Sequence, residues 1–228
     1  MASPPMKSLG LVLLALFLLS QAAPAYGARS LARGAVDNLV SNLPSWMMPR
    51  SLCIPTVSSW VEKHEGRHRC VYENEQGDKA IGVNYNLEDD RSARKSELKT
   101  VLADYEKVLK GEQCLNDVQI SALLLADTKR KLDEVAETVH KLDDLCCDIQ
   151  AVLADLDWSM GQKGLDDSDS FLKETENGNW EDAATALRAT IWCVSHKKRC
   201  DADVAKIEKG CSKGLNLPDF VHTTYSQQ

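Results

Sequence analysis

Hydrophobic positions recur at helical spacing through the second half of the chain. Between Ile120 and Leu145, apolar residues return every three or four positions or at sums of these intervals. This predicts one long amphipathic helix, or two helices with a break near His140. The pattern extends over too few heptads to favour a coiled coil. Asn116, with Gln119 three residues later, predicts a capping box at the start of this helix.

Shorter helices are predicted on both sides. Thr56 is a suitable N-cap, and the apolar positions that follow at helical spacing predict a helix that Gly66 ends near Glu65. The same periodicity predicts further helices at 97–105, at 148–160 before Gly161 and Gly164, and from Trp180 onward.

A period of two replaces the helical period after Gly66. Residues 70–72 and 80–85 alternate in polarity, and the glycine-containing turn at 76–78 separates them. This predicts a small antiparallel hairpin directly after the first helix. Many helices with one small sheet indicate an α+β fold that is mostly helical.

The first residues follow another pattern. Lys7 precedes an apolar run at 11–19, and small residues follow around Ala25 and Gly27. This is typical of a secretory signal peptide at 1–27 and predicts an extracellular protein, or one in a vacuolar or lysosomal lumen. The run is too short to favour a membrane span, so no membrane association is expected after its removal. The other predicted regions are an irregular segment at 28–52, a domain at 53–214 and a loose tail at 215–228.

All eight cysteines lie after the predicted signal peptide. An even number in an exported chain predicts disulfide bonds, although most of the pairing stays open. Cys193 and Cys200 are close enough for a local bridge. A zinc site is the alternative use of the cysteines, but there is no CxxC pair or histidine cluster to support it. The acidic run at 166–170 could suggest a calcium site, but it lacks the glycine and distal glutamate of an EF-hand loop. No metal or cofactor is expected.

Composition excludes some partners. The chain has 27 basic and 34 acidic residues and a net charge of −7, which disfavours nucleic acid and anionic membranes. The five histidines are scattered, and His64 is expected as a helix-end or exposed residue. No Ser or Cys hydrolase motif, phosphate-binding loop or dinucleotide fingerprint is present.

The stretch 60–88, WVEKHEGRHRCVYENEQGDKAIGVNYNLE, has the most specific pattern. It resembles the opening of the phage-type lysozymes, especially the secreted, cysteine-bearing eukaryotic ones, which reads approximately E-G-x-x-x-x-x-Y-x-D-T-x-G-x-x-T-I-G-x-G-Y-N-L. The residues in register with it are Glu65, Gly66, Tyr72, Gly77, Ile81, Gly82, Tyr85, Asn86 and Leu87.

Four positions depart from this pattern. Asn74 stands at the position of the catalytic Asp and Ala80 at that of a Thr, while Glu75 and Asn84 replace Thr and Gly. Asn74 cannot act as a carboxylate base, and Ala80 has no hydroxyl to hold the attacking water. Loss of one such group typically costs about 100-fold or more in rate. The nearby candidate replacement carboxylates are Glu73, Glu75 and Asp78.

The second half also resembles the family. Three short patterns occur in the same order as in the family: M-G-x-x-G after an aromatic helix, then W-x-x-A-A, then a Trp followed by an Arg and a Gly. The matching residues are Trp158, Met160, Gly161 and Gly164, then Trp180, Ala183 and Ala184, then Trp192, Arg199 and Gly210. The resemblance spans about residues 53 to 211.

This resemblance implies a disulfide-braced, two-lobed, lysozyme-like fold for 53–214 with a cleft between the lobes. It implies Glu65 as the general acid, Arg199 as its partner, and Trp158 and Tyr85 as substrate-binding residues. The implied function is that of a secreted muramidase with an incomplete catalytic set, which acts on or binds peptidoglycan or related β-1,4-linked amino-sugar polymers in antimicrobial defence. The acidic net charge opposes efficient action on anionic cell walls, although the basic clusters at 67–69 and 197–199 could offset it near a cleft.

Two alternatives stay open beside this interpretation. The first is a non-catalytic glycan-binding or protein-interaction module on the same scaffold. The second is a structural secreted protein in which a buried Glu65–Arg199 pair only holds two lobes together. The sequence gives no indication of the oligomeric state.

Overall fold

The computed structural model of the chain describes residues 50–211. The predicted signal peptide, the predicted irregular segment up to residue 49, and the predicted tail lie outside the described residues. Within them, no helix is both long enough and apolar enough to cross a bilayer.

The helices and strands confirm a mostly helical α+β fold with a small antiparallel sheet. In chain order they are η2 (Arg50–Leu52), α3 (Ile54–Glu65), β1 (His68–Glu73), β2 (Lys79–Gly82), β3 (Tyr85–Asn86), α4 (Arg91–Thr100), α5 (Tyr105–Leu109), α6 (Asp117–Thr138), η3 (Leu142–Asp144), α7 (Cys147–Asp166), α8 (Asp169–Glu176), α9 (Trp180–Arg188), α10 (Ile191–Ser195) and α11 (Lys197–Lys209), where η denotes a 3-10 helix.

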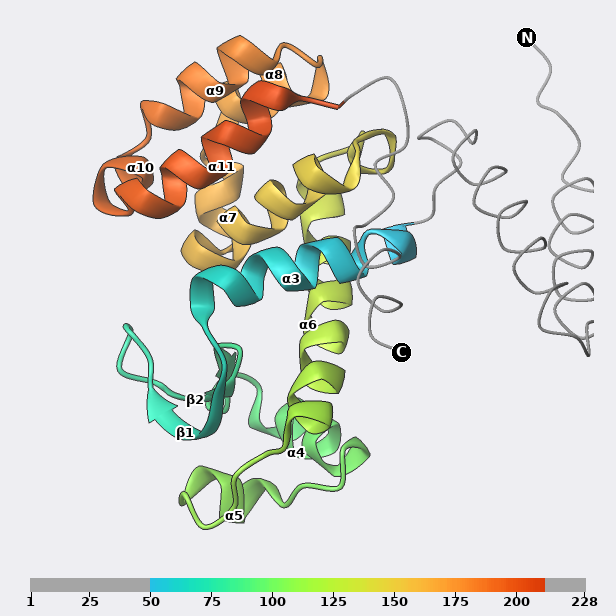
Figure 1. Ribbon diagram of the computed structural model, residues 1–228, viewed down its shortest axis with the longest axis vertical. Coiled ribbons are helices and arrows are strands. Elements are labelled where there is room, and N and C mark those ends of the chain that lie inside the picture. The colour runs from blue at the N-terminus through green and yellow to red at the C-terminus, as the bar shows by residue number, and fades with distance from the viewer. Residues whose placement is uncertain (1–49, 212–228) are drawn as a thin grey trace, which may run out of the picture. The chain divides into compact units, whose positions relative to one another are not determined.

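The long helix α6 connects two groups of elements (Figure 1). The sheet, α4 and α5 lie toward its N-terminal end, and helices α7 to α11 lie toward the other end (Figure 1). Helix α3 packs against both α6 and α7, and it leads directly into β1. The end of α3 is therefore the point where the chain passes from the helical group to the sheet.

The start of α6 confirms the predicted capping box. The Asn116 side chain accepts a hydrogen bond from the backbone of Gln119, and the Gln119 side chain accepts one from the backbone of Asn116. The helix ends at Thr138, which confirms the break near His140. Leu145 follows η3 instead of lying in a second long helix.

Four predicted boundaries were wrong. The predicted helix at 97–105 is the end of α4 and the start of α5, because the chain turns between Thr100 and Tyr105, where Leu102 adopts a positive φ of 59°. Helix α3 begins at Ile54 with Cys53 as its N-cap, before the predicted cap Thr56. Helical structure does not stop at Gly161: this residue takes φ 74° and interrupts α7, and the helix then continues to Asp166. The predicted strand at 80–85 is two short strands, because Asn84 adopts a positive φ of 48° in the turn between them.

Four disulfides account for all eight cysteines, so the fold is disulfide-braced. The predicted local bridge Cys193–Cys200 is present, next to the junction of α10 and α11. The other pairs are Cys53–Cys147, Cys70–Cys114 and Cys146–Cys211. The first of these joins the start of α3 to the start of α7, two helices that pack along each other.

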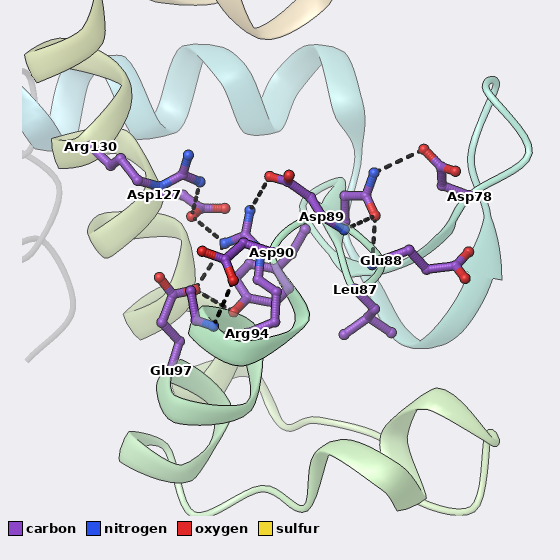
Figure 2. A network of polar contacts seen from close by, with 12 residues as sticks. Asp78, Leu87, Glu88, Asp89, Asp90, Arg94, Glu97, Asp127 and Arg130 are labelled. Carbon is purple, nitrogen blue, oxygen red and sulfur yellow. Dashed lines mark hydrogen bonds and ion pairs between the residues drawn. The ribbon is translucent and has the colours of Figure 1, made fainter.

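A buried ion network joins the sheet group to α6 (Figure 2). Arg94 of α4, whose side chain is 5% exposed, donates to Glu97 at 2.8 Å and to Asp127 of α6 at 3.1 Å. Arg130 donates to the same oxygen of Asp127 at 2.7 Å, and Asp89 lies 3.4 Å from Arg94 at the surface. The two arginines thus face the buried Asp127 and the half-buried Glu97 and Glu134, with a fourth acid, Asp89, exposed.

Candidate functional site

A cavity of about 790 Å³ lies where the end of α3, the β1–β2 hairpin, α7 and the start of α11 come together. The predicted site residues that line it are Glu65, Glu73, Asn74, Glu75, Trp158 and Arg199. These residues come from four elements and span more than half of the described chain. The fold therefore brings together most, but not all, of the predicted site.

Glu65 is the last residue of α3, and Gly66 ends the helix with φ 75°, a backbone conformation that favours glycine. Its Oε1 atom lies 2.7 Å from Nη1 of Arg199, and its Oε2 atom accepts a hydrogen bond of 2.9 Å from Asn84. The side chain is 13% exposed. The pairing of Glu65 with Arg199 that the resemblance implies is present, and the carboxylate lines the cavity.

Arg199 also binds a second acid on its inner side. Its Nε donates to Oδ2 of Asp155 at 2.7 Å, and its Nη2 donates to Oδ1 at 2.9 Å. Burial by itself lowers the pKa of Arg199, but hydrogen bonding and charge from Asp155, with a further contribution from Glu65, outweigh burial and raise the pKa above its ordinary value. The guanidinium therefore stays charged and connects the cavity to the interior.

Asp155 belongs to a cluster of acids that the sequence interpretation missed. It is fully buried in α7, and its Oδ2 lies 3.1 Å from Nδ1 of His64. Asp203 of α11 is also fully buried, and its Oδ1 accepts a 2.8 Å hydrogen bond from the indole of Trp60. A signal for Asp155 was available, because it is a charged residue inside the most apolar predicted helix.

The pKa values of the two buried acids, Asp155 and Asp203, are shifted in opposite directions from that of an ordinary aspartate. Burial raises the pKa of Asp155, but hydrogen bonds from His64 and Arg199 outweigh it and lower that pKa below the ordinary value. Burial, followed by the charge of Asp155, raises the pKa of Asp203 to about 8. His64, expected at a helix end or exposed, is 10% exposed and contacts Asp155.

Within residues 50–211, the side chains with a spacing suited to a metal ion are His64, Asp155 and Asp203, whose ligand atoms lie within 4.8 Å of one another. Arg199 already engages both oxygens of Asp155, and its positive charge would repel a cation. This cluster therefore does not fit a metal site.

Asn74, at the position of the family's catalytic Asp, lines the cavity but holds the hairpin turn. Its Oδ1 accepts hydrogen bonds from the backbone of Gln76 at 3.1 Å and of Asp78 at 2.9 Å. Its Nδ2 donates to Asn84 at 3.4 Å. Since an amide carries no proton-accepting charge and its oxygen is engaged in the turn, Asn74 has a structural role.

Three predicted site residues lie outside the cavity lining. Ala80 is fully buried in β2, so neither its methyl group nor a side chain of similar size would contact a ligand there. Tyr85 is 2% exposed, and its hydroxyl donates to Glu97 at 2.5 Å, beneath Arg94. Asp78 accepts a hydrogen bond from Asn86. Tyr85 as a substrate-binding residue was therefore wrong, because this side of β3 faces the core instead of the cavity.

The cavity lining is less acidic than the whole chain. Its hairpin side holds the exposed Glu73 and Glu75, and its α11 side holds Lys197 and Lys198 next to Arg199. The cluster at 67–69 is not in the lining; its arginines pair with Glu62 and Asp117. Positive charge that offsets the negative net charge of the chain near the cavity therefore comes from residues 197–199, together with Lys63 of α3.

No protein-family model matches the chain, and a comparison with curated proteins found no significant similarity. The resemblance to phage-type lysozymes consequently rests on the residues quoted for it and stays a prediction.

Proposed function

We propose that the protein is a secreted, lysozyme-like glycan-binding protein that takes β-1,4-linked amino-sugar polymers such as peptidoglycan into the cavity beside Glu65. Glu65 is the candidate general acid of a weakened hydrolysis. The supporting observation is the position of this one carboxylate, fixed by Arg199 and Asn84 at the end of α3 and lining a cavity.

The chemistry of glycoside hydrolysis favours Glu65 among the acids of the cavity. The reaction needs one carboxyl group fixed at the leaving oxygen and a second group that attacks or activates water. Glu73 and Glu75 are exposed and line the hairpin side, whereas Glu65 is largely buried and bonded through both oxygens. Fixed geometry is what the first role requires, so we assign it to Glu65.

The second role is where the proposed enzyme is weak. Asn74 carries no charge, and the two exposed acids of the hairpin are the cavity carboxylates left for it in the described residues. A flexible exposed acid provides little orientation. We therefore expect the protein to bind the polymer and to cleave it slowly.

Binding has support from the lining and from the cysteines. Trp158 offers an aromatic surface for a sugar ring, and Lys197 and Lys198 offer positive charge to anionic wall polymers. Four disulfides suit an oxidising compartment, which agrees with export.

The second candidate function is a binding module with no hydrolysis. The observation that favours it is the engagement of the Asn74 side chain in the hairpin turn, which stabilises the scaffold without serving catalysis. Both candidate functions place the glycan in the same cavity, so they differ only in whether the bound glycan is hydrolysed.

A cell-wall turbidity assay with a parallel pull-down on insoluble peptidoglycan and chitin tests the proposal. Glu65→Gln is the test variant, and Glu112→Gln, an exposed acid outside the cavity lining, is the matched control. Slow lysis that Glu65→Gln abolishes and the control retains supports the enzyme. Binding without lysis by all three proteins supports the binding module. Neither lysis nor binding by the native protein overturns both candidates.

A further inference from the structure

The acids behind Arg199 outnumber the positive charges that face them. Glu65, Asp155 and Asp203 surround one guanidinium that pairs with the first two. On α3, His64 and Trp60 face the cluster, as a single imidazole and an uncharged donor. On α11, Lys206 lies over the ring of Trp60 and pairs with Asp148 instead of Asp203. Three ionised acids would therefore leave a buried excess of negative charge.

Asp203 has one oxygen free to carry a proton. Its Oδ1 accepts the hydrogen bond from Trp60, while its Oδ2 is buried and has no hydrogen-bond donor in the described residues. A buried carboxylate oxygen without a donor costs free energy, whereas a protonated one can donate to a neighbouring acid. Asp155 is that neighbour, since the two carboxyl groups lie within 4.8 Å.

We propose that Asp155 and Asp203 share one proton and act as positioning residues for Arg199. The pair then presents a single negative charge to Arg199, and the guanidinium keeps its contacts with both Asp155 and Glu65. In this arrangement the proton is on Oδ2 of Asp203, the buried oxygen that no donor within residues 50–211 reaches, and the ionised Asp155 holds Nε and Nη2 of Arg199. Nη1 is thereby left pointing to Glu65 at the cavity.

The arrangement has a pH limit. Burial and the charge of Asp155 raise the pKa of Asp203 to about 8, so the proton is retained at neutral pH. Above that pH a second negative charge develops beside Asp155 and draws Arg199 inward, which weakens its contact with Glu65. The shared proton is a statement about the folded protein alone, whereas its importance for glycan binding rests on the proposed function.

Nuclear magnetic resonance of the disulfide-bonded protein tests the shared proton without any glycan. With carboxyl-¹³C aspartate and ¹⁵N-arginine labels, we expect the Asp203 carboxyl to titrate with a midpoint near 8, roughly four pH units above an ordinary aspartate. The Nε–H resonance of Arg199 should shift with the same midpoint, because that group donates to Asp155. An Asp203 midpoint near 4, or an Arg199 resonance that does not follow Asp203, overturns the proposal.

Asp203→Asn provides the conservative variant. The amide accepts from Trp60 and donates to Asp155 as the protonated acid does, so the Arg199 resonance should keep its neutral-pH position and no longer titrate near pH 8. The matched control is Asp201→Asn, an exposed acid on the same helix, which should leave the native titration unchanged. If Asp203→Asn does not fold, the titration of the native protein still decides.

The pull-down, repeated across pH, connects the cluster to function. Native binding should fall severalfold above pH 8, while Asp203→Asn should bind equally at pH 7 and pH 9. Equal loss in both proteins overturns the positioning role. Absence of binding at every pH contradicts the proposed function and leaves the resonance result on the shared proton intact.

Discussion

Arg94 and Arg199 are both largely buried arginines surrounded by acids, yet their surroundings differ in charge balance. Arg94 shares Asp127 with Arg130, so two cations face the one buried acid of this network (Figure 2). Its other acids, Glu97, Glu134 and Asp89, are all reached by solvent. Arg199 faces its acids without a second arginine.

This difference separates a structural ion network from one that can respond to its surroundings. A balanced buried network is fully ionised over a wide pH range and serves mainly to hold elements together. An unbalanced network needs a proton, and the position of that proton depends on pH and on any charge that enters the cavity. Perturbed acids at a cavity are for this reason better functional candidates than perturbed acids in the core.

The largest effect should come from breaking the balanced network. Asp127→Ala leaves Arg94 buried without its main interior partner, and loss of one partner of such a pair typically costs about 3–5 kcal/mol in the free energy of unfolding. Urea denaturation measures it. The control Asp89→Asn removes an exposed acid and should cost below about 1 kcal/mol. Similar costs for both variants would remove the distinction between interior and surface partners.

Asp203→Asn should stabilise the protein at neutral and alkaline pH. In the unfolded chain an aspartate has a pKa of about 3.9, whereas Asp203 in the folded protein has a pKa of about 8. The folded protein therefore holds one more proton than the unfolded chain between these pH values. Stability contributed by this group therefore falls as pH rises from about 4 to about 8 and is constant above that.

The amide variant does not suffer this loss. Its gain in unfolding free energy should be near zero at pH 4 and reach about 2–4 kcal/mol at pH 8, as measured by denaturant titration at several pH values. A gain that is the same at pH 4 and pH 8 would show that Asp203 does not hold its proton in the folded state.

Adding an acid on the cavity side should raise activity. In Asn74→Asp, one carboxylate oxygen can keep the two turn hydrogen bonds while the other enters the cavity, so we expect roughly tenfold faster wall lysis, equivalent to about 1.4 kcal/mol in the barrier. Ala80→Thr is the informative companion. Because Ala80 is fully buried, this second change should add no activity and should lower stability. Activity that requires both changes would contradict the buried placement.

The smallest effect should come from the surface cations. Lys198 is exposed at the edge of the cavity, so Lys198→Gln should weaken binding to peptidoglycan less than about fivefold. The difference should disappear in about 1 M salt, because exposed charges are screened there. Persistence of the difference at high salt would indicate a direct hydrogen bond instead of long-range attraction.

Local sequence patterns were sufficient where the interacting residues are neighbours in the chain. The Asn116–Gln119 capping box and the end of α3 at Gly66 depend on positions within one helical turn, and Cys193–Cys200 joins residues seven positions apart. The division of the predicted strand at Asn84 could not be read from alternation, because it depends on a backbone angle and not on polarity.

The sequence by itself determined the fold class, the placement of Glu65 at a helix end before a hairpin, and the use of cysteine in disulfides. These properties follow from short-range periodicity, caps and composition. The resemblance implied that Arg199 pairs with Glu65, but the tertiary structure alone decided that Arg199 also binds Asp155, that Asp203 is buried beside them, and that Tyr85 faces the core. The reason is distance: these partners lie on α3, α7 and α11, and hydrogen bonds and charge interactions depend on how helices pack, which no local pattern encodes.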